Sequence, residues 1–264
     1  MSFHWIDPEK YSFNSLLLMD RFLIRQIMIP DGEEYARNLG TALANHPAVA
    51  WYFREKAPET AGEVERLIAA APQNCSLEQV RAAERFVLDR HDWAVVYIYP
   101  EAMEKSCPYI RDWDPARLFE LADFRGKLVL DVGAGTGRLA FAAAKQARQV
   151  YASEPVDRLR EYMRARIARE GIGNVKVLDG VCECLPYEDN TFDIVMSGHV
   201  VGDDYDRELG ELERVTKPGG WVLNCPGEDD REACPDQEQT GRGYECCPYP
   251  GKSGVTVYRY RKRV

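Results

Sequence analysis

The chain has 264 residues and a formal net charge of −9 at pH 7, and 45% of its residues are hydrophobic. This hydrophobic share supports a sizeable core and excludes wholesale disorder. The acidic charge disfavours nucleic acid as the main partner, since phosphate binding needs a basic surface. We interpret the one basic cluster, Arg259 with residues 261–263, as the solvated side and end of a last strand. The longest apolar stretches, such as residues 93–99, are far shorter than the roughly 20 residues of a membrane helix, so we expect no membrane span.

The N-terminus lacks the basic flank and apolar run of a secretory signal, so we expect a cytoplasmic protein with reduced thiols. Two of the eight cysteines form the pair Cys182-x-Cys184 and two others are the adjacent Cys246 and Cys247. Neither pair has the C-x(2–4)-C spacing of a structural zinc site. We therefore predict free thiols and no metal site. The sequence does not indicate an oligomeric state.

The first 120 residues are predicted to be mainly helical. Asn14 or Ser15 caps a helix whose apolar residues continue to Met28, and Pro30 ends it. A second helix carries Tyr35, Leu39 and Leu43 on one face. Two later helix starts have capping-box spacing, Thr60 with Glu63 and Ser76 with Gln79. Residues 1–120 are thus expected to form a helical cap that helps to bind the substrate.

Residues 121–264 alternate between apolar runs, turns and amphipathic helices. Buried strands are predicted at residues 127–132, 150–153, 175–178, 192–196 and 221–224, with helices at 139–146, 157–170 and near 205–215. This alternation predicts an α/β fold with a Rossmann-like, mostly parallel sheet. Residues 244–249 and 255–260 flank Pro250–Gly254 and predict an antiparallel C-terminal hairpin.

A glycine-rich loop, residues 133–137, follows the first predicted strand, and Asp131 lies just before it. In open parallel sheets, ligands bind at the carboxyl ends of strands, near the point where the strand order reverses. Glycines there allow positive φ and let the backbone approach a ligand without an intervening Cβ. Nucleotide-type cofactors are therefore the leading ligands.

Glycine spacing separates these cofactors. A dinucleotide fingerprint is G-x-G-x-x-G, but here the third glycine comes one position early and Arg138 takes its place. The G-x-x-x-x-G-K-[ST] pattern of a P-loop is absent. The Asp131 carboxylate would repel a pyrophosphate but suits a ligand with ammonium and sulfonium groups. An NAD-dependent oxidoreductase is thus disfavoured.

Four segments, in order, resemble the class I S-adenosylmethionine (SAM)-dependent methyltransferases. They are residues 128–137, like the family's first motif; Glu154, at the end of the second strand; residues 184–195, like the family's LPF-x-D-x-x-FD segment; and residues 213–220, like its R-V-L-K-P-G-G turn. The resemblance spans about residues 120–225 and points to small-molecule enzymes similar to quinone-biosynthesis C-methyltransferases. It implies SAM as cofactor, S-adenosylhomocysteine as product, a small-molecule acceptor and a SAM-binding core at residues 121–264.

The resemblance also implies roles for single residues. Gly133 and Gly135 would pass backbone beneath the methionine part of SAM, and Asp131 would help to hold its amino-acid end. Glu154 would accept hydrogen bonds from both ribose hydroxyls; the alternative is a solvated acid at a strand end. The remaining implied cofactor contacts are Ala134, Thr136, Gly137 and Ser197.

One departure from the family concerns the adenine. Many members have G-D-A-E before the Leu-Pro, and its Asp holds the adenine amino group, whereas this chain has Val181 at that position. Asp179 or Glu183 is one substitute. The alternative is that Val181 packs on the adenine face while the backbone N–H of Cys182 bonds the ring.

Methyl transfer from a sulfonium requires alignment and desolvation, and a base only where the acceptor must lose a proton. His199 follows the fourth strand and suits a base near neutral pH, but it also fits a hydrogen-bonded structural residue. Asp203 and Tyr205 are lesser candidates. The aromatic residues at 51–53, 93, 97 and 99 either line an acceptor pocket or, as we favour, form helical core.

The sequence therefore predicts a SAM-dependent methyltransferase acting on a small molecule that the sequence does not identify. The alternative is a SAM-binding regulatory or interaction protein that has the fold but does not transfer the methyl group. Turnover of SAM would separate the two.

Overall fold

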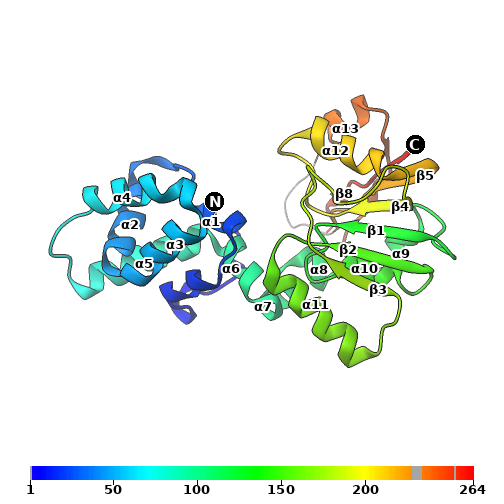
Figure 1. The fold of residues 1–264 in the computed structure, drawn as a ribbon. Helices are drawn as coiled ribbons and strands as arrows, with labels where there is room; N and C mark the ends of the chain where they lie inside the picture. Colours follow the sequence, from blue (N-terminus) through cyan, green and yellow to red (C-terminus); the bar gives the residue numbers. More distant parts are fainter. Residues whose placement is uncertain (1, 228–233, 253) are drawn as a thin grey trace. The chain divides into compact units, whose positions relative to one another are not determined.

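The computed structural model describes residues 2–227, 234–252 and 254–264. The chain divides into two compact units, Met1–Ser106 and Cys107–Val264, coloured from blue to blue-green and from green to red in Figure 1. Within the described ranges, no helix is both long enough and apolar enough to cross a membrane.

The first unit consists of helices in its described part. The face of α2 predicted from Tyr35, Leu39 and Leu43 is buried, and α2 packs against α4 and α5. Among the aromatic residues considered for a pocket, Phe53 is core whereas Trp51 is 57% exposed. The elements are η1 (Pro8–Lys10), η2 (Phe13–Leu18), α1 (Arg21–Ile27), α2 (Gly32–Asn45), α3 (Pro47–Lys56), η3 (Pro58–Thr60), α4 (Ala61–Ala70), α5 (Leu77–Arg90), α6 (Asp92–Ile98) and α7 (Pro100–Ser106), where η marks a 3₁₀ helix.

Local capping explains where the helix predictions hold and where they fail. The Ser76 capping box with Gln79 is confirmed. The one at Thr60 is wrong, because the Thr60 hydroxyl donates back to the Ala57 carbonyl at the end of a 3₁₀ turn. The single helix predicted up to Met28 is also wrong: η2 and α1 are separate helices, joined by extended backbone at which Met19 is fully buried.

The second unit is built on a seven-stranded sheet in the order β3-β2-β1-β4-β5-β9-β6. The first five strands of the chain run parallel, and β9 runs antiparallel to both β5 and β6, which confirms the predicted fold class. The strands are β1 (Leu128–Val132), β2 (Gln149–Ser153), β3 (Val175–Leu178), β4 (Phe192–Ser197), β5 (Thr216–Asn224), β6 (Glu245–Cys246), β7 (Tyr249–Pro250), β8 (Thr256–Val257) and β9 (Tyr260–Arg263).

Helices cover both faces of this sheet, which explains why its central strands β1 and β4 are mostly apolar. Val129, on one face, packs with residues of α10, whereas Leu130, on the other, packs with residues of α12. The strand order reverses between β1 and β4, so their carboxyl ends flank the expected ligand position. The helices are α8 (Pro108–Arg111), α9 (Ala116–Phe119), α10 (Arg138–Ala143), α11 (Asp157–Glu170), α12 (Tyr205–Arg214) and α13 (Gln237–Gly241).

The C-terminal region differs in detail from the predicted hairpin. The strands β7 and β8 form a short separate hairpin around the predicted turn, of which Ser253 lies outside the described residues. In the main sheet, β9 begins only at Tyr260 and pairs with both β5 and β6.

Arg259 is buried rather than solvated, and it ties the end of the chain to residues 117–120. Its guanidinium donates to the Arg117 carbonyl (2.5 Å) and lies 2.9 Å from the Glu120 carboxylate. Trp113 and Leu118 join the core beside α10. Residues 107–120 therefore belong to the second unit, and the division falls after Ser106 rather than at residue 120.

Candidate functional site

The glycine loop between β1 and α10 has the backbone geometry that its sequence predicts. Gly133, Gly135 and Gly137 all have positive φ, between 59° and 92°. A Cβ at Gly133 would collide with Val200, and one at Gly137 with Phe141, whereas one at Gly135 would meet nothing within 4 Å. The loop is thus packed at both ends and open in the middle.

Glu154 is buried at the carboxyl end of β2, only 2% exposed, so its interpretation as a solvated acid is wrong. Its Oε2 accepts the N–H of Gly135 (2.8 Å) and its Oε1 accepts the N–H of Val156 (2.9 Å). An ionised carboxylate has about four acceptor positions, so these two bonds are compatible with further donors such as sugar hydroxyls. Glu154 therefore connects the second strand to the open middle of the loop.

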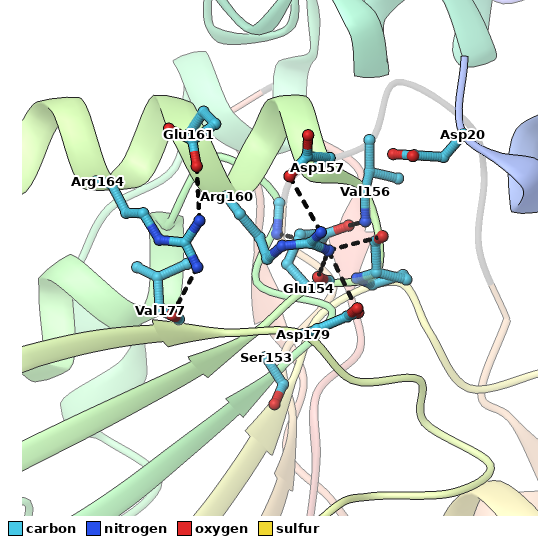
Figure 2. Close-up of polar contacts among 12 residues, drawn as sticks. Asp20, Ser153, Glu154, Val156, Asp157, Arg160, Glu161, Arg164, Val177 and Asp179 are labelled. Atoms are coloured by element: carbon cyan, nitrogen blue, oxygen red, sulfur yellow. Dashed lines mark hydrogen bonds and ion pairs between the residues drawn. The ribbon is translucent and has the colours of Figure 1, made fainter.

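Arg160, which the sequence analysis did not single out, braces the backbone around Glu154. Figure 2 shows its guanidinium among the ends of β2, β3 and α11. Its Nη1 donates to the carbonyls of Glu154 (2.7 Å) and Pro155 (2.8 Å) and to Asp179 (3.3 Å), and its Nη2 donates to Asp157 (3.1 Å). The only sequence signal was the i, i+3 spacing with Asp157. Asp179, one candidate for the adenine, is thus held beside Glu154.

Val181 and Cys182 lie in opposite environments. Val181 is 40% exposed, whereas Cys182 packs in the core beside α12. Its thiol faces the Glu208 carbonyl at 3.9 Å, and burial raises the pKa of Cys182 to about 12. The side chain of Cys182 therefore faces away from solvent, and Val181 is the member of the pair available to a ligand.

Beyond β4, the chain turns through Ser197 to His199 and on to α12. His199 is exposed, and its ring centroid lies 4.4 Å from that of Tyr109 in α8. The backbone N–H of Asp203 donates to the buried Glu208 carboxylate (3.3 Å). The Tyr205 hydroxyl donates to Asp236 (2.9 Å), which links α12 to α13.

Arg138, at the start of α10, links that helix to the segment after β5. Its Nη2 donates to the carbonyls of Cys225 (2.7 Å) and Pro226 (3.2 Å), and its guanidinium lies 4.6 Å from the Trp113 ring centroid. Burial lowers the pKa of Arg138. This contact pattern explains the arginine at the position that a dinucleotide fingerprint reserves for glycine.

Asp131 is buried in β1, near the carboxyl edge of the sheet. In the described residues, it is one of several polar side chains there that have an atom without a hydrogen-bond partner. Its Oδ2 accepts the Ala140 N–H (2.9 Å), and burial raises its pKa to about 7 although the charge of Arg138 opposes this. Within the described part of the chain, no hydrogen-bond partner is found for five buried atoms here: Asp131 Oδ1, Thr136 Oγ1, Arg138 Nη1, Ser197 Oγ and Asn224 Oδ1. Buried polar atoms are normally paired, so this group fits a ligand that carries both donors and acceptors.

The cysteines do not form a common site. All eight are free thiols, and Cys182 and Cys225 are buried whereas Cys184 is exposed. Over the described ranges, no three histidine, cysteine or acidic side chains gather so that they could hold a metal ion.

A Rossmann-like sheet with this strand order, a glycine loop after β1 and a buried acid after β2 defines a nucleotide-cofactor-binding protein. Residues 129–220 match a family model described as a methyltransferase domain. This part of the chain is similar to methyltransferase domains, and the cofactor that this similarity and the four motifs imply is SAM. The open loop at Gly135, the Glu154 carboxylate and the unpaired atoms of Asp131 and Ser197 fit that cofactor's hydroxyl, ammonium and carboxylate groups.

Among curated proteins, the chain is similar to demethylmenaquinone methyltransferase of Geobacillus kaustophilus, with 37% identity over 38% of this chain and 44% of that protein. It is also similar to a ubiquinone/menaquinone biosynthesis C-methyltransferase of Francisella tularensis, with 30% identity over 43% of this chain and 48% of that one. The chain thus spans less than half the length of these two relatives. Among solved structures, a SAM-dependent methyltransferase from Aquifex aeolicus matches with a TM-score of 0.48 and 22% identity, over 62% of this chain and 96% of that one.

Proposed function

We propose that this chain transfers the methyl group of SAM to a small-molecule acceptor. The observation that carries the proposal is the direct bond between Glu154 and the open position of the glycine loop at Gly135. This bond brings a sugar-binding acid and a backbone cradle together at the carboxyl ends of β1 and β2. We place the activity in the cytoplasm, with no nucleic acid as partner.

Different residues bind different parts of the cofactor. Glu154 accepts hydrogen bonds from the ribose hydroxyls, and such charge-assisted pairs select a diol. The backbone of residues 133–137 lies beneath the methionine part, and Asp131 Oδ1 and Ser197 Oγ serve its polar end. Val181 packs on the adenine, with the Cys182 N–H or Asp179 at the ring edge.

Bound SAM supplies an electrophilic methyl group: the S–CH₃ bond breaks as the bond to the acceptor forms, and the sulfonium becomes a neutral thioether. The chain's contribution is to align the acceptor and exclude water. His199 is positioned after β4 as the candidate base for an acceptor that must lose a proton. We propose that the helical unit helps to bind the acceptor.

Binding and turnover test the proposal separately. Calorimetry with S-adenosylhomocysteine is expected to show binding, and SAM labelled on its methyl group is expected to label a small molecule in a metabolite extract. Failure to bind either adenosyl ligand would refute the proposal. Binding without turnover of SAM would favour the regulatory alternative.

Replacing Arg160 by methionine is expected to weaken S-adenosylhomocysteine binding about tenfold, because the loss of charged donors to the Glu154 and Pro155 carbonyls lets Glu154 move. Calorimetry measures the change, and Arg160→Lys should recover part of it. Arg169→Met is the matched control, since Arg169 is an exposed residue of the same helix. Equal affinity in Arg160→Met and Arg169→Met would show that the brace serves stability alone.

A further inference from the structure

A row of side chains crosses the carboxyl edge of the sheet on the face covered by α12. Ser153, Val132, Ser197, Asn224 and Tyr260 are successive partners in the register from β2 to β9. Val132 and Tyr260 pack in the cluster that includes residues of α12. Since neighbouring residues in register point to the same face, the polar members of the row lie side by side.

Two of the four polar members of this row have a hydrogen-bond partner for their side-chain oxygen, and two have none in the described residues. The Ser153 hydroxyl is 2.7 Å from that of Tyr187, and the Tyr260 hydroxyl accepts the Asp236 N–H (2.6 Å). Ser197 Oγ and Asn224 Oδ1, in contrast, have no hydrogen-bond partner in the described part of the chain, although Ser197 is 0% and Asn224 only 5% exposed. These two atoms belong to adjacent residues at the ends of β4 and β5.

The orientation of the Asn224 amide is fixed by a chain of hydrogen bonds that starts at a carboxylate. Asp236 Oδ2 accepts the side-chain amide N–H of Gln239 (2.8 Å), so Gln239 must turn its Oε1 the other way. That oxygen accepts from Asn224 Nδ2 (3.1 Å). Asn224 therefore has to present its carbonyl oxygen at the end of β5.

Asp236 is well suited to start this chain because it acts as an acceptor only. Its Oδ2 also accepts the Tyr205 hydroxyl, and its Oδ1 accepts the backbone N–H groups of Glu238 and Gln239. Burial by itself would raise the pKa of Asp236. These hydrogen bonds, of which the one from the Gln239 side chain has the largest effect, instead hold that pKa below its ordinary value. Gln239 is itself only 2% exposed, so no bulk water competes for its amide.

We infer that Asn224 determines acceptor specificity: its Oδ1, beside Ser197 Oγ, binds a hydrogen-bond donor, so the acceptor carries an O–H or N–H group. This inference rests on the proposed methyl transfer. An amide oxygen is too weak a base to take the proton, so Asn224 selects and orients the acceptor. Gln239 and Asp236 are positioning residues that act through Asn224.

The test uses the full chain saturated with S-adenosylhomocysteine and a panel of small molecules in matched pairs. Each pair differs only in methylation of the donor, as in 1-naphthol against 1-methoxynaphthalene, phenol against anisole, and 4-methylaniline against its N,N-dimethyl form. Equilibrium binding of both members is measured for the native chain and for Asn224→Leu, Gln239→Met and Gln237→Met. Gln237 is an exposed residue of the same helix, so Gln237→Met is the matched control.

The native chain and Gln237→Met are expected to bind the donor member about tenfold more tightly, as one well-made hydrogen bond allows. Asn224→Leu should bind both members equally. Gln239→Met should lose or reverse the preference, because the freed amide can turn its Nδ2 toward the ligand. The Gln239→Met result distinguishes a residue that positions the Asn224 amide from one that only packs against it. It can be measured even if Asn224→Leu does not fold.

Two results would overturn the inference while leaving the proposed function intact: no preference for donors in a native chain that binds S-adenosylhomocysteine, or an unchanged preference in both Asn224→Leu and Gln239→Met. Absence of any bound donor molecule from the panel also counts against it. Loss of S-adenosylhomocysteine binding by the native chain would instead contradict the proposed function itself.

Discussion

Replacing Glu154 by glutamine is expected to lower the affinity for S-adenosylhomocysteine about 100-fold. The carboxylate accepts the Gly135 and Val156 N–H groups, and in our proposal it also accepts two ribose hydroxyls. A neutral amide has one acceptor oxygen, and its NH₂ group would face a backbone donor. Hydrogen bonds to charged groups contribute about 1.5–3 kcal/mol each, so the loss of one or two of them accounts for the expected change. Calorimetry at neutral pH measures it.

The same substitution should also destabilise the fold by about 1–3 kcal/mol, because one buried backbone N–H is left without an acceptor. Denaturant unfolding measures this effect independently of ligand. Glu161→Gln on α11 is the matched control, since Glu161 is exposed and contacts only Arg164 among the bonds described here. A folded Glu154→Gln protein with native affinity would remove the ribose role from this residue.

Replacing Asp131 by asparagine is expected to stabilise the ligand-free protein above neutral pH while weakening SAM binding. Burial raises the pKa of Asp131 from its ordinary 3.8 to about 7. The stability that this group contributes is therefore complete below about pH 4 and is lost as the pH rises through about 7. At about 1.4 kcal/mol per tenfold change in proton affinity, the loss is at most about 4 kcal/mol.

Asparagine does not titrate, and its Oδ1 can still accept the Ala140 N–H. The difference in unfolding free energy between variant and native protein should thus be smallest near pH 4 and reach a plateau above about pH 7. Urea unfolding across this range measures it. Asp123→Asn is the control, since Asp123 is exposed and its bonds with Arg125 lower its pKa to about 2. Parallel pH profiles for native and Asp131→Asn would contradict this account.

The sheet was predictable because its strands are covered by helices on both sides. Such strands, here residues 128–132 and 192–197, are mostly apolar, and the turns between them need glycine at fixed positions. The glycine loop was predictable for the same local reason: positive φ at Gly133, Gly135 and Gly137 is a property of single residues.

Features that depend on distant partners were not predictable. The buried Arg259 bonds a carbonyl at Arg117, 142 positions away, and the chain divides after Ser106 rather than at residue 120. The role of Arg160 depends on carbonyls, which every residue has, so its i, i+3 spacing with Asp157 does not reveal that role. The sequence offers one hint of a role for Asn224, which is a polar residue at the end of an apolar strand. It offers no such hint for Gln239 and Asp236, which orient the Asn224 amide.

Because β9 lies between β5 and β6 in the sheet, β6 can join the sheet only after β9, although β6 is synthesised first. In the described residues, β6 is joined to the sheet only through β9, which follows it in the chain. Until residues 260–263 have left the ribosome, β5 presents a bare edge of unpaired amides, and such edges invite pairing with other chains. A nascent chain stalled before that point would be a target for chaperones, and the aggregation of truncated products should depend on whether they include these four residues.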